Sequence, residues 1–255
     1  MVYYYLRKMK LSVPKIIVLQ EVDSTNNYAR QLVVSNAAVD GTVVLAHFQY
    51  QGRGQQGNHW ESERNRNLTL SVVFYPEFLE PANQFFLSQV VSLGIFSFVS
   101  EEVDGVKIKW PNDIYVGNRK IGGILIENSV QGRFLFSSIA GMGININQEV
   151  FLSNAPNPVS LKQLTGKNYP VEDMARQMVS HIFRWYEKLK CGKFEEIESA
   201  YISHLFRMRE WSLFRANGVS FEARIIGIGE FGQLMLEDRS GKITGYLFKE
   251  VEFVI

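Results

Sequence analysis

The residues best suited to chemistry lie in four segments that combine glycines with charged or amide side chains. The first, Gln51–Gly57, opens a polar stretch of seventeen residues, Gln51–Asn67, with three glycines, three arginines and one apolar residue, Trp60. Glycine lets a backbone approach an anion closely, and arginine supplies charge-assisted hydrogen bonds to phosphate or carboxylate. Loops of this length are uncommon in compact domains and are often functional. The stretch predicts an anion-binding loop, although a flexible surface loop explains its spacing equally well.

The glycine spacing in this stretch also fits a dinucleotide-binding turn. Gly52, Gly54 and Gly57 match Gly-x-Gly-x-x-Gly. Such a turn must open a helix. Residues 58–66 are polar without helical periodicity, and a strand-like run begins at Leu68. The context therefore argues against a dinucleotide site.

The other three segments place charge or glycine on strand-like sequence. Lys107–Asp113 ends in Pro-Asn-Asp, which by itself indicates only a turn. Arg119–Leu125 and Gly141–Asn145 each interrupt an apolar strand with two glycines, which mark a bulge, tight packing or the close approach of a ligand. Each segment alone has an ordinary structural explanation.

Composition excludes several kinds of site. The chain has 255 residues, and 27 Lys and Arg against 26 Asp and Glu leave a net charge of +1, which provides no global field for nucleic acid or membrane. The single cysteine, Cys191, excludes an intrachain disulfide and fits a reducing, cytoplasmic compartment. The four histidines are scattered, so we expect no metal-ligand cluster. We find no apolar run of about 18 residues and expect no membrane span.

Strands and helices alternate around these segments. We expect strands at 16–19, 41–48, 68–75, 106–110, 120–127 and 134–145, and helices after Asp23–Thr25 and at 82–103, 171–189 and 194–206. Four short strands follow at 212–214, 221–228, 233–236 and 243–247, with turns between them. The periodicity predicts an α/β or α+β protein that ends in a small β-barrel.

Taken together and in order, these motifs resemble the biotin–protein ligase family. The resemblance rests on Asp23–Asn26, Gly52–Gly54, Lys109–Asp113, Lys120–Leu125 and Gly141–Asn145, and extends to Pro158–Leu161. It implies an α+β fold, with a central mixed β-sheet and flanking helices related to class II aminoacyl-tRNA synthetases, over residues 1–207. Residues 208–255 would form a small SH3-like barrel. About 15 residues precede the first strand, so we expect a monofunctional ligase without the DNA-binding domain that some relatives carry.

The resemblance also implies a reaction in two steps. Biotin and ATP, with Mg²⁺, would give biotinyl-5′-AMP and pyrophosphate. A lysine of a biotin carboxyl carrier protein would then attack the mixed anhydride. No DNA or membrane partner is expected, while a homodimer is possible.

The implied roles fall on residues of the matched motifs. The biotin-binding residues would be Ser24, Thr25, Asn26, Gln49, Arg53, Gly54, Gln55, Lys120, Gly122, Gly123, Gly141 and Gly143. The ATP-binding residues would be Arg53, Lys109, Trp110, Asn112 and Asn145. Arg53 and Lys120 would neutralise the α-phosphate, the four glycines would let backbone approach the bicyclic ring, and Asp113 is the candidate to orient or deprotonate the acceptor lysine.

One position departs from the family pattern. Many members have a second arginine two residues after Arg53, where this chain has Gln55. We therefore expect either compensation by Arg64 or Arg66 or a leakier adenylate. A lipoate or octanoate ligase is the nearest alternative, although the Arg-Arg-x-x-Gly-Gly-Gly loop of that family is absent. A non-enzymatic biotin-binding sensor is the second alternative, and it would not need both Arg53 and Lys120.

Overall fold

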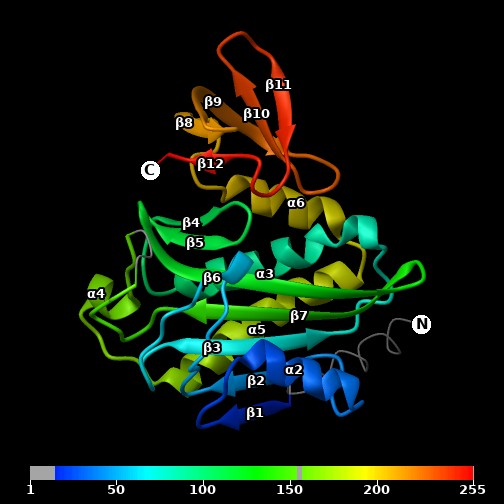
Figure 1. Cartoon of the computed structure of the whole chain (residues 1–255), viewed down its shortest axis with the longest axis vertical. Coiled ribbons are helices and arrows are strands. Elements are labelled where there is room, and N and C mark those ends of the chain that lie inside the picture. The colour runs from blue at the N-terminus through cyan, green and yellow to red at the C-terminus, as the bar shows by residue number, and fades with distance from the viewer. Residues whose placement is uncertain (1–14, 154–156, 255) are drawn as a thin grey trace, which may run out of the picture.

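Two β-sheets and the helices around them make up the structure (Figure 1). The computed structural model describes residues 15–153 and 157–254. The first sheet has seven strands in the order β1-β2-β3-β7-β6-β5-β4, and only β1 and β2 pair in parallel. These strands are β1 (Ile16–Leu19), β2 (Thr42–Ala46), β3 (Leu68–Phe74), β4 (Val106–Lys109), β5 (Asp113–Val116), β6 (Arg119–Gln131) and β7 (Phe134–Ile144). This mixed sheet with flanking helices is the α+β fold that the resemblance implies.

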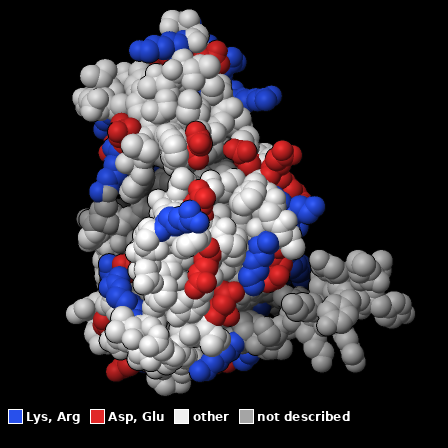
Figure 2. Space-filling model, turned by 90° about the vertical axis from the view of Figure 1, so that its right-hand side faces the viewer, with Lys and Arg blue, Asp and Glu red and all other residues white. Residues whose placement is uncertain are grey.

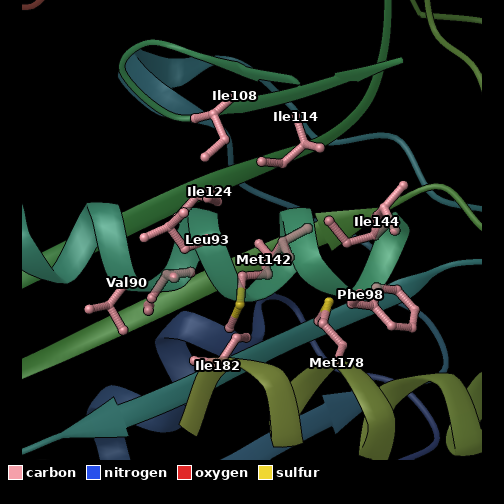
Figure 3. Close-up of a cluster of buried hydrophobic side chains, with 14 of the residues drawn as sticks. Val90, Leu93, Phe98, Ile108, Ile114, Ile124, Met142, Ile144, Met178 and Ile182 are labelled. Atoms are coloured by element: carbon pink, nitrogen blue, oxygen red, sulfur yellow. The ribbon is translucent and has the colours of Figure 1, made fainter. Parts of the chain in front are cut away.

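Helices cover the two faces of this sheet unequally. On one face, α3, α5 and α6 build the main core, and Figure 3 shows Leu93 of α3, Ile182 of α5 and Met142 of β7 within it. On the other face α2 covers only β2, β3 and part of β7, through a small cluster around Ala29 and Ile139. The helices are α2 (Thr25–Val34), α3 (Phe85–Val99), α4 (Leu161–Thr165), α5 (Val171–Lys190) and α6 (Phe194–Ser203), with 3₁₀ turns η1 (Gln55–Gly57) and η2 (Pro81–Asn83). Part of the second face therefore has no helix over it.

The bare part of that face is also poor in side chains. Gly123 of β6 pairs directly with Gly143 of β7, and Leu125 pairs with Gly141. Because side chains alternate between the faces of a strand, Gly123, Gly141 and Gly143 all belong to the face on which α2 packs. Neighbouring strands without Cβ atoms leave a hollow in the sheet surface beside α2.

The second sheet has five antiparallel strands in the order β11-β10-β9-β8-β12, consistent with a small SH3-like barrel. Its strands are β8 (Trp211–Ala216), β9 (Val219–Ile228), β10 (Leu234–Asp238), β11 (Ile243–Tyr246) and β12 (Glu252–Phe253). It joins the first sheet through specific contacts: Trp110 Nε1 donates a hydrogen bond to the Gly232 carbonyl at 2.9 Å. The strand β12 lies near the end of β4, where the Phe253 ring is 5.0 Å from Lys109 Nζ.

Two predicted segments differ in the structure, and two short elements are additional to the prediction. The run after Lys109 is not only a turn, because Asp113–Val116 forms the strand β5 between β4 and β6. The helix predicted at 82–103 begins as η2 and ends at Val99, since 100–105 turns back toward β4. The short elements α4 and β12 have too few residues to show a periodicity and were not predicted.

The expectation that no apolar run reaches membrane-spanning length was also wrong. Pro81–Val99 has 19 residues and is long and apolar enough by length and composition to cross a membrane. More than half of it is buried inside the fold, where α3 packs on α5 and α6. A helix that is hydrophobic on all sides is expected in a core of this size, so the run is weak evidence for a membrane span. Charged side chains of both signs are interspersed on the face seen in Figure 2.

The crossing of α3 and α5 depends on Gly94. A Cβ added there would lie 2.6 Å from the Ile182 Cα and 2.8 Å from its nitrogen. We predict that Gly94→Ala destabilises the protein by about 1–3 kcal/mol, because overpacking against backbone outweighs the ~1 kcal/mol that alanine gains in helix propensity. Denaturant unfolding measures it. Gly227→Ala is the control, since no atom lies within 4 Å of its added Cβ. Equal midpoints for the two variants would contradict the close packing.

Candidate active site

A cleft of about 860 Å³ opens over the glycine hollow, between α2, the 51–61 segment and the end of the second sheet. All the residues assigned to the site from sequence line it, with the exception of Gly122. Gly122 is buried, and a Cβ there would overlap the Ile144 side chain, so its role is packing within the sheet. The structure thus brings residues from six sequence segments to one place, while their individual roles stay predictions.

A buried hydrogen-bond network lies at the start of α2. Gln49 Oε1 accepts from the Thr25 backbone N–H at 2.7 Å and from the Thr25 hydroxyl at 3.0 Å. The Ser71 hydroxyl of β3 lies 2.7 Å from Thr25 Oγ1 and 2.6 Å from Asn26 Oδ1. Ser71 is fully buried. It was not predicted as a site residue, because nothing in the sequence distinguishes it from an ordinary polar residue in a strand. These contacts hold the helix start and Gln49 in one rigid group.

The network fixes what each amide offers to the cleft. Asn26 Nδ2 donates to the Leu125 carbonyl at 3.3 Å and to Glu127 Oε2 at 2.8 Å, which uses both of its protons. Its oxygen therefore remains as an acceptor. Gln49 has the opposite orientation, because its oxygen accepts both hydrogen bonds from Thr25. Its Nε2 makes no hydrogen bond within the described part of the chain, so it can donate to a ligand. Because both residues line the cleft, it presents one oriented donor and one oriented acceptor.

The first part of the 51–67 segment is folded into a small hairpin. The sequence was equally compatible with a flexible surface loop, and the structure shows the hairpin instead. Gly54 N–H donates to the Asn58 carbonyl at 2.7 Å, and Trp60 N–H donates to the Gly52 carbonyl at 2.9 Å, around η1. A Cβ on Gly52 would meet the Trp60 carbonyl oxygen at 2.5 Å, so only glycine fits. The hairpin carries Arg53 and Trp60 into the cleft together.

The glycine hollow is filled by side chains of the protein. A Cβ on Gly143 would overlap the Trp60 indole, and one on Gly141 would overlap the Asn26 amide. A Cβ on Gly123 would touch Trp60 at 3.3 Å. The first function of these glycines is therefore to let Trp60 and Asn26 lie against the sheet, and Trp60, not bare backbone, forms the wall. The Trp60 Nε1 is buried without a hydrogen-bond partner among the described residues.

Charge is concentrated at the end of β4 and β5. Lys120 Nζ lies 2.7 Å from Asp113 Oδ1, off the hydrogen-bonding direction, so the contact is an ion pair. Lys109 Nζ lies 5.2 Å from the Tyr115 ring and 5.0 Å from the Phe253 ring, a cation–π arrangement. Burial lowers the pKa of Lys109, although Asp113 opposes the shift. With Arg53, these cations make the cleft a site for an anion.

A carboxylate missed in the sequence anchors the hairpin. Glu61 accepts backbone N–H bonds from Leu152 at 2.9 Å and Ser153 at 2.7 Å, and a bond from Gln148 Nε2 at 3.1 Å. Although burial raises the pKa of Glu61, these hydrogen bonds outweigh it and hold the pKa below its ordinary value. The hairpin is therefore fastened to the segment that follows β7.

Asn145 and Asn112 line the cleft, and the Nδ2 of each already donates a hydrogen bond to a backbone carbonyl. Asn145 Nδ2 donates to the Val159 carbonyl at 3.1 Å, and its Oδ1 is buried with no partner among the described residues. Asn112 Nδ2 donates to the Ile124 carbonyl at 2.8 Å. The Asn145 oxygen is thus an acceptor that the protein itself leaves unsatisfied, which a ligand donor would satisfy.

The compensation expected for Gln55 is not present. Arg64 pairs with Glu21 at 2.6 Å, and Arg66 lies 3.9 Å from Glu63. Neither arginine lines the cleft, whereas Gln55 does. The arrangement leaves Arg53 as the cation of this hairpin within the cleft.

Comparison with known proteins agrees with this geometry. The model of the biotin/lipoate A/B protein ligase family matches residues 18–145, which is half of the chain. The chain belongs to this family. It is therefore an enzyme, a ligase, and the matched stretch contains every assigned site residue.

Individual relatives extend the match beyond that stretch. The chain is 26% identical to the biotin–[acetyl-CoA-carboxylase] ligase of Paracoccus denitrificans, over 88% of this chain and 95% of that protein. It is 27% identical to the bifunctional ligase/repressor BirA of Bacillus spizizenii, over 88% of this chain and 70% of that protein. Among solved structures, the biotin protein ligase from Aquifex aeolicus in complex with biotin and ATP matches with a TM-score of 0.79 at 26% identity, over 94% of this chain and 99% of that one.

The Glu61 anchor generates a pH prediction. Because the folded-state pKa of Glu61 is lowered, its contribution to stability is present above the unfolded value of about 4.5 and is lost as pH falls through the folded value. Glu61→Gln should lower the urea midpoint at pH 7, and the difference from wild type should shrink as the pH is lowered from about 4.5 toward 3. The exposed neighbour Glu63→Gln serves as control, with a midpoint near wild type at both pH values. A difference for Glu61→Gln that persists undiminished at pH 3 would contradict the anchor.

Proposed function

We propose that this ligase activates biotin with ATP to biotinyl-5′-AMP and transfers the biotinyl group to a lysine of a biotin carboxyl carrier protein. The observation that carries the proposal is one cleft that holds an oriented donor, an oriented acceptor and the cations Arg53, Lys109 and Lys120. The names of the relatives support biotin as the acid: the Paracoccus protein is a biotin–[acetyl-CoA-carboxylase] ligase, and the Aquifex structure holds biotin and ATP.

The polar end of the cleft suits the head of biotin. A cyclic urea presents N–H donors and a carbonyl acceptor within one small ring. Asn26 Oδ1 would accept from a ureido N–H, and Gln49 Nε2 would donate to the ureido oxygen. Trp60 over Gly143 would supply the apolar wall for the bicyclic ring. A dithiolane ring has no such groups and would leave this donor and acceptor unpaired, which disfavours lipoate.

The cationic part of the cleft suits the nucleotide. Arg53 and Lys120 would neutralise the α-phosphate as the biotin carboxylate attacks it and pyrophosphate leaves. Asn145 Oδ1 would accept from the adenine amino group. We treat Mg²⁺ as part of the nucleotide substrate, because the described residues contain no cluster of three acidic, histidine or cysteine ligands and Mg²⁺ commonly binds through phosphates. A sensor that bound only neutral biotin would not need these cations.

The second step needs a neutral amine. A lysine has a reference pKa of about 10.4, so most of the acceptor is protonated at pH 7. Asp113 is held by Lys120 in this structure. If Lys120 turns toward the phosphate in the adenylate complex, Asp113 gains a free oxygen to take the proton of the acceptor. A cytoplasmic location and a monofunctional enzyme stay predictions.

Pyrophosphate release tests the activation step. With ATP and Mg²⁺, biotin should stimulate release and lipoate should not, because only biotin pairs with Asn26 and Gln49. Lys120→Ala should lower kcat/KM by about 10²–10³, the cost of losing one preorganised cation in a closed site. Lys162→Ala is the matched control: Lys162 is 20% exposed against 23% for Lys120 but pairs with Glu149 outside the cleft. If lipoate alone stimulates release, the protein is a lipoate ligase and the proposal is wrong. If biotin binds tightly but no pyrophosphate is released, the protein is a biotin-binding sensor.

Separate half-reactions test Asp113. Asp113→Asn should slow the transfer of biotin from preformed biotinyl-5′-AMP to the carrier by about 10²-fold, more than it slows pyrophosphate release. The transfer defect should diminish as pH rises toward 10, because the acceptor amine then loses its proton without help. An equal, pH-independent loss in both steps would show that Asp113 acts only by holding Lys120.

A further inference from the structure

Glu127 of β6 contacts two residues of the site, Asn26 and Arg53, but is not part of the cleft lining. Its Oε2 accepts from Asn26 Nδ2 at 2.8 Å. Its Oε1 accepts from Arg53 at 3.1 Å and from Arg30 of α2 at 2.6 Å. One carboxylate therefore joins the amide assigned to biotin and the arginine assigned to the phosphate, and neither the reaction scheme nor the sequence motifs gave it a role.

The contact with Asn26 decides which end of that amide faces the cleft. The Asn26 amide could turn either its oxygen or its NH₂ group toward the cleft. Glu127 selects the oxygen, because its carboxylate accepts a proton from Asn26 Nδ2 that an amide oxygen could not supply. The Ser71 hydroxyl, which can donate or accept, lies 2.6 Å from Asn26 Oδ1 and is compatible with this orientation, so the carboxylate of Glu127 decides it. The acceptor available to a ureido N–H thus depends on an acidic partner behind it.

The contact with Arg53 places that side chain at the cleft before a phosphate arrives. Arg53 is held at two points, by Glu127 and by Asn27 Oδ1 at 3.0 Å, although its side chain is 41% exposed. When a phosphate takes Arg53, Glu127 keeps its shorter contact with Arg30. The carboxylate is then still paired with a cation and repels the incoming nucleotide less.

We propose that Glu127 is a positioning residue that acts on both substrates through two different partners: on biotin through Asn26 and on ATP through Arg53. The inference rests on the proposed function, because it assigns those two partners to the two substrates. It predicts that biotin affinity and ATP use both depend on a side chain that touches neither substrate.

Glu127→Gln tests the inference because glutamine has one oxygen. That oxygen can accept from Asn26 or from the arginines, while the –NH₂ group faces the other donors. We expect the Kd for biotin, measured by calorimetry without nucleotide, to rise about tenfold, as for the loss of one hydrogen bond. We expect kcat/KM for ATP, from pyrophosphate release at saturating biotin, to fall about tenfold as Arg53 loses its charged partner.

A second variant separates the two paths. Glu127→Asp keeps the charge but shortens the side chain by one carbon. The long, partly exposed arginines can follow it, whereas buried Asn26 cannot. We expect it to weaken biotin binding while it leaves kcat/KM for ATP within about twofold of wild type.

The double variant asks whether Glu127 acts through Arg53. In an Arg53→Ala background, Glu127→Gln should change kcat/KM for ATP by less than about twofold, yet still raise the biotin Kd about tenfold. Glu237→Gln is the matched control: the Arg224–Glu237 pair in the second sheet has side chains 40% and 22% exposed, against 41% and 22% for Arg53–Glu127. The control should change neither quantity.

Wild-type turnover is measured first, so the two proposals fail in different ways. No biotin-stimulated pyrophosphate release by wild type would overturn the proposed function. If wild type turns over, an unchanged biotin Kd in Glu127→Gln and Glu127→Asp, or full additivity with Arg53→Ala in kcat/KM for ATP, would overturn the role of Glu127. A thermal unfolding midpoint for each variant separates a loss of folding from a loss of positioning.

Discussion

The site depends on a steric constraint between two neighbouring strands: at Gly123 of β6 and at Gly141 and Gly143 of β7, no Cβ atom stands on the face of the sheet below the cleft. Gly123 and Gly143 are direct partners in the ladder, and Gly141 is two residues along on the same face. An alanine at Gly143 or Gly141 would overlap Trp60 or Asn26. Two paired glycines weaken a sheet through their chain entropy and lack of packing, so their presence is best explained by what lies on them. The aromatic wall and the oriented amide both exist because the floor is bare.

The same floor helps to hold the arginine hairpin in place. Trp60 lies on the glycines, Glu61 is bonded to Leu152 and Ser153, and Arg53 is bonded to Asn27 and Glu127. A polar segment of this composition has little apolar surface to bury, so these few contacts must offset its loss of chain entropy. The hydrogen bonds of Glu61 and Arg53 join the hairpin to segments distant in the sequence, and they lie at the surface. The position of the hairpin is therefore set by these contacts within the protein, and Arg53 is held at the surface, where its two partners are accessible to solvent.

The sequence was sufficient for the parts of the site that are carried by motifs, and insufficient for the parts that depend on register. Glycines, arginine and amides could be found because their residue types are chemically unusual within apolar strands. Gly122 could not be told from Gly123 without knowing which face of β6 each occupies. Glu127 and Ser71 both contact Asn26, but they lie 101 and 45 residues away from it in the sequence. A short sequence motif cannot contain two residues so far apart. Trp60 was visible as the one apolar residue in a polar segment, and that contrast was the signal that could have identified it.

The C-terminal region that carries the second sheet forms part of the cleft wall. Phe248, Lys249 and Phe253 line the cleft with residues from β4 and β5, and Phe253 faces the Lys109 ammonium. A buried lysine costs free energy unless its charge is stabilised, and here two aromatic faces and the nearby Asp113 share that task. Loss of Phe253 would remove one of the two rings and open Lys109 to water. The cationic character of the site is thus set jointly by the two sheets, since Phe253, the aromatic residue of β12, faces a lysine of the first sheet.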